Sequence, residues 1–327
     1  MSDESVRLHL EVRAGAGVIR RRDRGVLRLT GSDRVAFLHR MVTNDVAGAG
    51  TFGGCQAALC TPKGKMIADL RIHVRADRVI LDTERGCVGA ARETLERFVI
   101  TDDVTIEDRT DAVGRIGVHG PRSAGVLAAV GGSAPDAAPH RGTGLSFGSG
   151  RFLAAATRDL GDVGFELFVE GADADALEAA LVEAGAVRFG PETEESLRVE
   201  AGTPRFGVDH DADTIPPEAI DERAVSYTKG CYPGQETISR MRHVGHANRR
   251  LVPLRIDGAE PPAPGAEVLA GGEARGRITS AAWGPTVGAV VALAWLRREA
   301  LDADALEVAG PDGERRRATR HAPIVAP

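Results

Sequence analysis

The chain has 327 residues and a formal net charge of −6, with 43% hydrophobic and 27% charged residues, the composition of a globular protein long enough to bury a core in two or three units. The acidic balance argues against strong non-specific binding to nucleic acid or anionic membranes, although it leaves room for a local basic patch. No run of 18 or more apolar residues predicts a transmembrane helix.

The N-terminus and the cysteines indicate the cellular compartment. The first 15 residues are charged and lack the apolar core of a secretory signal. The four cysteines (Cys55, Cys60, Cys87 and Cys231) are too sparse for a disulfide scaffold, and no two of them form a C-x-x-C pair. We therefore expect a cytoplasmic protein with reduced thiols.

Two stretches of the chain predict the same order of elements. In the first, strands are expected at 25–31, 55–60, 65–76, 78–83 and 104–108, and helices at 32–42 and 89–99. In the second, strands are expected at 115–120, 151–159 and 164–171, and helices at 121–130 and 173–185. Ser32 is a good N-cap, and Pro121 is allowed in the first turn of its helix. The recurring order favours two related split βαβ sheets.

The remainder of the chain predicts a third helix, a loop and a β domain. The helix is expected at 191–202 and the loop, which holds three prolines, at 203–219. From Arg250 onward, short alternating runs between Gly and Pro turns favour a small antiparallel barrel or sandwich. We expect one region over 1–249, with subdomains at roughly 1–110 and 111–190 completed by 191–249, and a barrel domain over 250–327.

The stretch YTKGCYPGQETISRM (227–241) gathers a thiol, a cation, an amide, a carboxylate and both tyrosines of the chain. Lys229 and the backbone N–H groups of a glycine-bounded turn would favour the thiolate of Cys231. An inert, buried cysteine is the alternative, and the sequence leaves both open. His243 and His246 are nearby bases, but their spacing shows no activating order. A resident metal or iron–sulfur site would need more thiolates at defined spacing.

Three acidic or amide side chains could each form paired hydrogen bonds with a heterocycle that bears an amine and a ring N–H. Gln235 and Glu236 have the alternative role of capping the helix that follows them. Glu200 lies at the end of a predicted helix, where the macrodipole disfavours a negative charge, so its place there is more suggestive. Tyr227 and Tyr232 could stack on a flat ligand or serve as ordinary core residues.

A basic run follows this stretch. Residues 239–250 contain Arg240, Arg242, Arg249 and Arg250 and no acidic residue. Such a patch could bind a polyanionic ligand tail, a phosphate or RNA, or it could be a solvated surface. No Walker motif or G-x-G-x-x-G follows any predicted strand, so a Rossmann or mononucleotide site has no support.

Three segments, KGCYPGQE, LRVEAGTPRFGVD and FLHRMVTNDV, together resemble the folate-binding YgfZ branch of the aminomethyltransferase (glycine-cleavage T-protein) superfamily. The resemblance extends from about Gly31 to the C-terminal barrel, and KGCYPGQE is specific to the branch. It implies a three-lobed ring of two ferredoxin-like α+β units and a barrel, with tetrahydrofolate in the central channel. YgfZ-like proteins support the assembly or repair of iron–sulfur enzymes, including radical enzymes that modify tRNA.

The resemblance also assigns expected roles to residues. Glu200 matches the glutamate that faces the pterin, Cys231 the hallmark thiol and Tyr232 an aromatic position shared with the T-proteins. The remaining motif positions are Lys229, Gly230, Gly234, Gln235 and Glu236. On this basis we expect the loop to form one wall of the folate channel, with the glycines allowing close approach to the ligand. The basic run, including Arg240, would attract the glutamate tail of the folate.

One departure from the superfamily concerns the hairpin strand at 65–76. T-proteins carry an Asp-Asp pair there, and an aspartate in that region aids methylene transfer to folate. This chain has Ala68 followed by Asp69. Asp69 and Cys231 are therefore the candidate catalytic residues, and glycine-cleavage activity is placed in doubt while folate binding is not.

These observations predict a monomeric, tetrahydrofolate-binding accessory protein that acts with iron–sulfur proteins or cluster-assembly factors. Cys231 would then be a transient cluster ligand shared with a partner, or a nucleophile that accepts a one-carbon unit. The alternative is a folate-dependent aminomethyltransferase or demethylase. An RNA-contacting module is a third reading, against which the acidic balance and the lack of interleaved aromatic residues argue.

Overall fold

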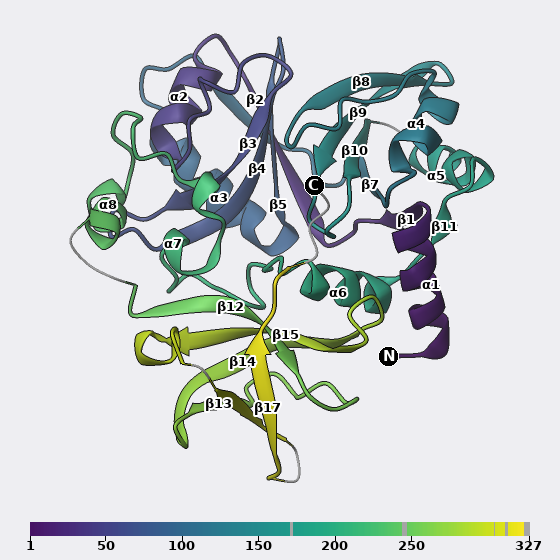
Figure 1. Cartoon of the computed structure of the whole chain (residues 1–327). Helices are drawn as coiled ribbons and strands as arrows, with labels where there is room; N and C mark the ends of the chain where they lie inside the picture. The colour runs from purple at the N-terminus through teal and green to yellow at the C-terminus, as the bar shows by residue number, and fades with distance from the viewer. Residues whose placement is uncertain (171–172, 244–246, 304, 311–312, 324–327) are drawn as a thin grey trace.

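The computed structural model describes residues 1–170, 173–243, 247–303, 305–310 and 313–323. Figure 1 shows three lobes, in which two sheets with their helices lie side by side above a barrel. The α+β fold class with a C-terminal antiparallel barrel is therefore confirmed.

The first lobe is a five-stranded antiparallel sheet in the order β3-β4-β5-β2-β6. Two helices cover one of its faces, where Leu27, Leu70 and Leu81 pack against Phe37 and Leu95. The elements of this lobe are β2 (Arg24–Thr30), α2 (Arg34–Met41), β3 (Gly54–Cys60), β4 (Met66–Val74), β5 (Val79–Glu84), α3 (Val88–Arg97) and β6 (Thr105–Asp108).

The second lobe is a six-stranded sheet in the order β11-β1-β7-β10-β9-β8. The short strand β1 comes from the N-terminal segment, so the first sheet is built from β2 to β6 alone. The elements of this lobe are β1 (Gly17–Arg20), β7 (Val113–His119), α4 (Ser123–Gly131), β8 (Gly142–Phe147), β9 (Gly150–Thr157), β10 (Gly164–Glu170), α5 (Ala174–Glu183) and β11 (Val187–Arg188).

The third lobe is a closed barrel in the order β12-β15-β14-β13-β16-β17. Helix α6 (Pro191–Glu200) packs on it and on α1 (Asp3–Ala14), and so ties the barrel to the N-terminal segment. The other elements are α7 (Pro216–Ala219), α8 (Gln235–His243), β12 (Arg249–Ile256), β13 (Glu267–Ala270), β14 (Glu273–Gly284), β15 (Ala289–Arg297), β16 (Leu306–Ala309) and β17 (Arg315–Arg320).

The two sheets face each other through the surfaces that their helices do not cover. Because side chains alternate along a strand, Leu27 points toward the helices and its neighbour Val26 toward the other sheet. Contacts between the sheets form an apolar layer of Val26, Ile80, Val113, Leu153, Ala155 and Phe168. Charged residues lie on both sides of this layer, and they carry the functional argument below.

Two local predictions need correction. Helix α2 is preceded by Asp33 at the N-cap, and the backbone N–H of Ser32 donates to Asp103 Oδ2 at 2.8 Å, so Ser32 is not its cap. Pro121 lies before α4, which begins at Ser123. Helix α1 was not predicted, because two of its three buried residues are polar and it shows no apolar stripe. Among the described helices, none is long and apolar enough to cross a membrane.

Candidate functional site

A layer of paired charges lies between the two sheets next to the apolar layer; we call it the inner charged layer. Arg24 on β2 donates to Asp82 at 3.1 Å and to Glu84 at 2.6 Å, both on β5. Arg115 on β7 of the other sheet donates to the same Asp82 at 3.2 Å and to Glu166 on β10 at 2.8 Å. The layer therefore joins two lobes, and apart from the half-buried Glu84 its side chains are almost fully withdrawn from water.

The carboxylates of this layer are held ionised by their arginine neighbours. Burial alone would raise the pKa of Asp82, but Arg115 and Arg24 lower it well below its usual range. Burial likewise opposes ionisation of Glu166, yet Arg21 and a contact from His119 hold its pKa well below the ordinary value. The layer thus carries fixed charges of both signs in a site of low polarity, where each one acts strongly on its neighbours.

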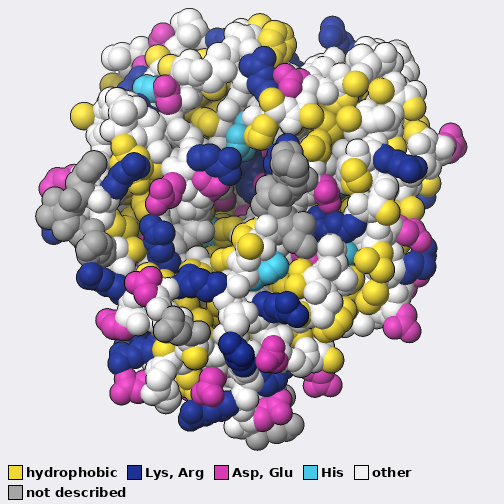
Figure 2. Space-filling view, viewed as in Figure 1, with side chains coloured by type: hydrophobic (Ala, Val, Ile, Leu, Met, Phe, Trp, Pro, Cys, Tyr) yellow, Lys and Arg dark blue, Asp and Glu magenta, His cyan; other side chains and the backbone are white. Residues whose placement is uncertain are grey.

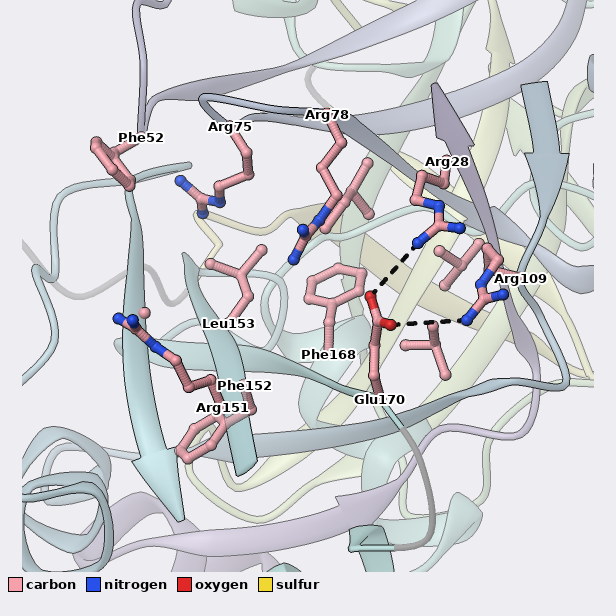
Figure 3. Close-up of a pocket in the computed structure, with 14 residues that line it drawn as sticks. Arg28, Phe52, Arg75, Arg78, Arg109, Arg151, Phe152, Leu153, Phe168 and Glu170 are labelled. Carbon is pink, nitrogen blue, oxygen red and sulfur yellow. Dashed lines mark ion pairs between the residues drawn. The ribbon is translucent and has the colours of Figure 1, made fainter. Parts of the chain in front are cut away.

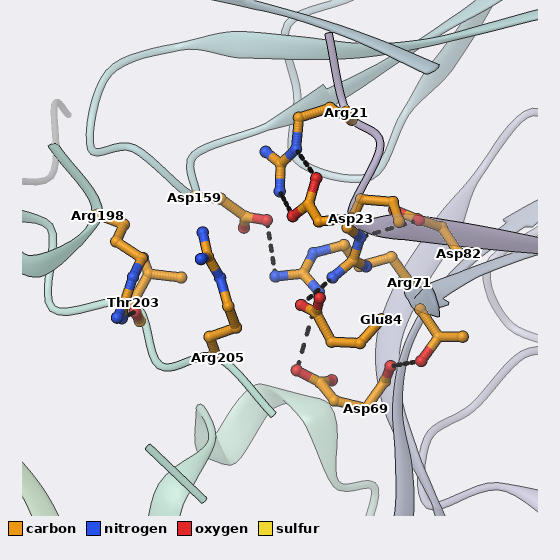
Figure 4. Close-up of polar contacts among 12 residues, drawn as sticks. Arg21, Asp23, Asp69, Arg71, Asp82, Glu84, Asp159, Arg198, Thr203 and Arg205 are labelled. Atoms are coloured by element: carbon orange, nitrogen blue, oxygen red, sulfur yellow. Dashed lines mark hydrogen bonds and ion pairs between the residues drawn. The ribbon is translucent and has the colours of Figure 1, made fainter. Parts of the chain in front are cut away.

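Asp69 lies on the inner face of β4 beside this layer (Figure 4). Its carboxylate accepts both of its described hydrogen bonds from the Gln56 amide, at 3.0 and 3.1 Å, and the Thr83 hydroxyl holds its backbone carbonyl at 2.8 Å. Arg71 lies 3.8 Å away and pairs more closely with Asp159, at 2.7 Å. Asp69 is therefore a buried carboxylate with one short-range neutral partner and a cation within reach.

The structure shows which way the missing aspartate of the T-protein pair, at position 68, would face. Ala68 is fully buried on the opposite face of β4, in the cluster of Leu70 and Ile72 under the helices. A carboxylate at that position would not face the second sheet. The half of the pair that this chain keeps, Asp69, is the one that faces the charged interior.

His210 adds a second polar group near Asp69. Its ring is buried, and neither ring nitrogen has a hydrogen-bond partner among the described residues. Burial lowers its pKa, against the opposing attraction of Asp69, Asp209 and Glu84, and this favours the neutral ring. A neutral imidazole offers one donor and one acceptor, so His210 can serve a bound heterocycle.

Glu200 is fully buried at the last position of α6, and both of its carboxylate oxygens are occupied. One oxygen contacts His9 at 3.1 Å and Arg13 at 3.2 Å. The other accepts from the backbone N–H of Thr286 at 3.0 Å and of Val287 at 3.4 Å. Burial would raise the pKa of Glu200, but His9 and Arg13 lower it. Glu200 thus joins α1, α6 and the barrel, and a pterin could pair with it only by displacing these partners.

Lys229 binds backbone carbonyls at the end of helix α2. Its ammonium donates to Val42 at 2.7 Å, to Asn44 at 3.1 Å and to His39, and it lies 5.0 Å from the centre of the Tyr232 ring. Burial lowers its pKa to about 8, while the charge of Asp45 opposes the shift. The lysine therefore fastens the KGCYPGQE loop to the FLHRMVTNDV segment, two of the three segments that carry the family resemblance.

Cys231 is exposed at the surface of this loop, whereas burial raises the pKa of Cys55 and Cys60 to about 12. The two glycines of the motif differ. Gly234 has a φ of +85°, and an added Cβ would lie 2.6 Å from the Cα of Gly64 in the neighbouring hairpin turn, so this glycine is needed for close packing of protein on protein. Around Gly230, an added Cβ would meet nothing within 4 Å.

Tyr232 packs beneath the loop against Ala58, Cys60 and Met66 of the hairpin. Its hydroxyl is buried without a hydrogen-bond partner among the described residues, and burial raises its pKa. Tyr227 instead lies nearer the surface, with the Arg242 guanidinium 4.0 Å from the centre of its ring. Of its two predicted roles, ligand stacking and core packing, the described contacts of Tyr232 are those of a core residue.

The remaining motif residues lie on α8. Gln235 is its first residue and is half-buried, Glu236 lies in its first turn and is exposed, and Arg240 is exposed on a later turn. A carboxylate in the first turn suits the helix dipole, as the capping alternative for Glu236 proposed. Of the two histidines named as possible bases, His246 and the side chain of His243 lie outside the described residues.

Comparison with known proteins agrees with this architecture. Residues 1–229 match the GCVT N-terminal domain, and residues 249–325 match the glycine cleavage T-protein C-terminal barrel domain. The chain belongs to the glycine cleavage T-protein family. Its relatives include the aminomethyltransferase of Streptomyces avermitilis, 31% identical over 88% of this chain and 80% of that protein, and that of Rubrobacter xylanophilus, 29% identical over 89% and 78%.

The solved structures agree on the fold. The glycine cleavage system aminomethyltransferase T from Bartonella henselae superposes with a TM-score of 0.88, covering 98% of this chain and 89% of its own, at 22% identity. At that identity the likeness establishes the shared fold of this T-protein family member. Neither comparison separates the YgfZ branch from the aminomethyltransferases themselves.

The inner charged layer and His210 were missed at the level of sequence. The strand at 65–76 alternates strictly, with Asp69, Arg71, His73 and Arg75 on one face. A polar face of this kind usually indicates contact with water. Here this face meets the polar face of a second sheet. Only a comparison of the polar–apolar alternation in the strands of both sheets could have shown this.

Proposed function

We propose that this protein binds a reduced folate and transfers a one-carbon unit from an aminomethyl group to it. The family membership and the aminomethyltransferases among its relatives support this alternative over the accessory role. The observation that carries it is Asp69, a buried carboxylate on the face of β4 that looks toward the charged interior. The residue missing from the T-protein pair, at position 68, faces the helices instead.

The residues around Asp69 fit a folate heterocycle. A pterin edge carries an amine and ring nitrogens, which need acceptors and donors placed side by side. Asp69 supplies acceptors, the Gln56 amide supplies a donor, and the buried His210 ring has two nitrogens without partners among the described residues. Such unpaired buried groups are costly unless a ligand satisfies them.

In this proposal two neighbouring nitrogens of the folate, when it is bound, would each form a bond to the methylene carbon, and the donor's carbon–nitrogen and carbon–sulfur bonds would break. Asp69 orients the folate amine and accepts the proton that it loses as the first new carbon–nitrogen bond forms, and passes that proton to the departing ammonia. The proton lost by the second folate nitrogen leaves with the sulfur as a free thiol. Arg71 lies 3.8 Å from the Asp69 carboxylate, and the inner charged layer ties β5 of the first sheet to β7 of the second beside it.

The test separates binding from transfer. We expect tetrahydrofolate to bind the wild type and Asp69→Asn with affinities within about tenfold, since the amide keeps one of the two acceptor oxygens of the carboxylate. Folate-dependent release of ammonia from an aminomethyl thioether should fall by about 10²-fold or more in the variant. Asp111→Asn, at an exposed loop position, is the matched control. Equal transfer rates in Asp69→Asn and wild type would refute the role of Asp69.

The YgfZ-like accessory function is a second candidate, which the exposure of Cys231 favours. The loop that presents it is fixed by Lys229 and by the tight contact of Gly234, so this thiol stands at a defined place on the surface. A surface thiol held in this way could ligate a cluster together with an iron–sulfur partner.

Complementation tests this second candidate. In cells lacking the chromosomal gene, Cys231→Ser should lose support of iron–sulfur enzymes while the purified variant keeps wild-type affinity for tetrahydrofolate. Cys87→Ser, at a buried thiol remote from the motif, is the control for a general loss of a cysteine. Full support by Cys231→Ser would exclude the accessory role of the thiol and leave one-carbon transfer as the function.

A further inference from the structure

A separate cavity of about 480 Å³ opens between the two sheets, across the apolar layer from the inner charged layer. Its apolar walls include Phe152, Leu153 and Phe168. Its charged lining consists of Arg28, Arg75, Arg78, Arg109, Arg151 and Glu170. We call it the outer arginine cavity. Its volume lies in the usual range for small-molecule sites, and a mostly apolar wall with a few convergent polar groups is their usual lining.

The five arginines outnumber the single lining carboxylate. Figure 3 shows Glu170 paired with Arg28, at 4.0 Å, and with Arg109, at 3.6 Å. Arg78 pairs with the exposed Asp77 at the rim. In the described part of the chain, Arg75 and Arg151 have no carboxylate partner. The cavity therefore holds uncompensated positive charge.

Arg75 is the most telling of these side chains. It is only 8% exposed, and its Nε and Nη2 have no hydrogen-bond partner among the described residues. Its guanidinium points into the cavity in Figure 3, and its described hydrogen bond runs from Nη1 to the carbonyl of Val74 at 3.2 Å. Burial, with Arg78 and Arg141 nearby, lowers its pKa to about 10, so it remains a cation at neutral pH. A buried, unpaired cation is costly unless something compensates it.

The backbone beside Arg75 approaches its guanidinium closely. A Cβ at Gly142 would lie 1.6 Å from the Arg75 Nη2, so a larger residue there would displace the end of the Arg75 side chain. Phe52 is held at a φ of +70°, rare for a large side chain, and its half-exposed ring lies 5.5 Å from the Arg75 guanidinium at the rim. Strained residues of this kind cluster at ligand sites.

We propose that the outer arginine cavity binds a small organic phosphate that carries an apolar or aromatic body. Arg75, Arg78 and Arg151 hold the phosphate, because a guanidinium fork matches phosphate oxygens and a phosphate can bring two charges and several acceptors on one group. The body lies on Phe168 and Leu153, with the Phe52 ring at its edge.

This site is distinct from the proposed folate site. Asp69, Gln56 and His210 are absent from its lining, and the side chains of Val26, Ile80 and Phe168 separate the cavity from Arg24, Asp82 and Arg115. The inference therefore goes beyond the proposed function. A failure of folate binding would not affect it, and its own failure would not affect folate binding.

Calorimetric titration with ADP, pyrophosphate and triglutamate tests the site. We expect wild-type protein to bind ADP more tightly than pyrophosphate, since only ADP offers a body for the apolar wall. Arg75→Met and Arg151→Gln should each weaken ADP binding by about tenfold or more. Arg92→Gln, an exposed arginine on α3 that removes the same charge, should leave it unchanged. Saturating tetrahydrofolate should not displace ADP.

In the titrations, two results would overturn the proposal. One is equal loss of ADP affinity in Arg92→Gln and Arg151→Gln, which would show non-specific charge attraction. The other is tighter binding of triglutamate than of ADP, which would assign the cavity to a polycarboxylate. A measurement on wild-type protein removes the question of folding. ADP should protect Arg75, Arg78 and Arg151, and leave Arg92 unprotected, from phenylglyoxal, as mapped by peptide mass spectrometry, and absence of that protection would reject the site.

Discussion

Arg24 and Arg28 lie four residues apart on strand β2, so their side chains project from the same face of the sheet. Their electrostatic surroundings nevertheless differ. Arg24 lies in the inner charged layer, where it pairs with two carboxylates of its own sheet. Arg115 in the same layer pairs with carboxylates of both sheets. Arg28 lines the outer arginine cavity, where one glutamate faces five arginines. The same pair of sheets thus builds a neutralised network on one side of Phe168 and a positively charged cavity on the other. The first is the pattern of a structural and positioning network, and the second that of a site awaiting an anion.

The largest effect should come from unbalancing the inner charged layer. Asp82→Asn leaves Arg24 and Arg115 facing a neutral amide in a buried site, and we expect the free energy of unfolding to fall by about 3–5 kcal/mol. Chemical denaturation with guanidinium chloride measures this. Asp111→Asn, which removes the partner of exposed Arg85, should change stability by less than about 0.5 kcal/mol. Similar losses of stability in both variants would contradict the structural role of the inner charged layer.

The pH dependence of the free energy of unfolding should depend on His73, which lies between the inner charged layer and the outer arginine cavity. Burial lowers its pKa to about 3, with Arg75 and Arg115 acting in the same direction and Asp82 opposing. Below about pH 6.5 the unfolded chain binds a proton on this histidine, whereas the folded chain does not. The contribution of His73 to the free energy of unfolding is therefore fully present above that pH and is lost as the pH falls toward 3. We expect a loss of about 3 kcal/mol between pH 6.5 and 4 from this group.

His73→Leu supplies the matching measurement, because leucine cannot titrate. Its unfolding free energy, followed over the same pH range, should fall less steeply than that of the wild type. Parallel curves for the two proteins would mean that His73 does not contribute. The slope that remains in the variant should come from the buried His140 and His210, whose pKa values burial also lowers, and from the paired carboxylates Asp82, Glu166 and Glu200, whose pKa values their cationic partners lower.

Phe168 separates the inner charged layer from the outer arginine cavity, so a smaller side chain at this position should change both stability and ligand binding. Arg115 lies 4.0 Å from the centre of its ring on the inner side, and the ring lines the outer cavity. Phe168→Leu should lower the free energy of unfolding by about 1–2 kcal/mol, through lost packing and a lost cation–π contact. It should also weaken ADP binding. Leu27→Val, on the helix-covered face of β2, controls for a general core defect. It should cost similar stability and leave ADP binding intact.

Much of the fold could be read from the sequence, because the helix-covered faces follow simple rules. Alternating apolar residues in 65–76 and in the C-terminal segment predicted β4 and the barrel, and the structure confirms both. Helix α1 could not be found in this way. Its buried residues include Ser5 and His9, which make polar contacts with partners 187 and 191 positions away, and no local pattern encodes such a partner.

The candidate site was less accessible to sequence reasoning. Asp69 was named through the family resemblance, and the structure adds that it faces the interior whereas Ala68 does not. Lys229, Tyr232 and Gly234 were expected at a ligand, but their described contacts are with protein. The outer arginine cavity has no motif. Its arginines come from separate strands and loops, and only the packing of sheet on sheet brings Arg75 and Arg151 to one cavity.

The smallest expected effect has the opposite sign. Arg75→Met keeps the apolar stem and removes a buried cation without a carboxylate partner, so the free energy of unfolding should rise by about 1 kcal/mol rather than fall. Gains of this kind mark residues retained for function at a cost in stability. Denaturant titration without ligand measures the gain, and repetition with saturating ADP should remove it, since binding then stabilises the wild type more than the weaker-binding variant. Destabilisation by Arg75→Met in the absence of ligand would place Arg75 with Arg24, as a structural arginine.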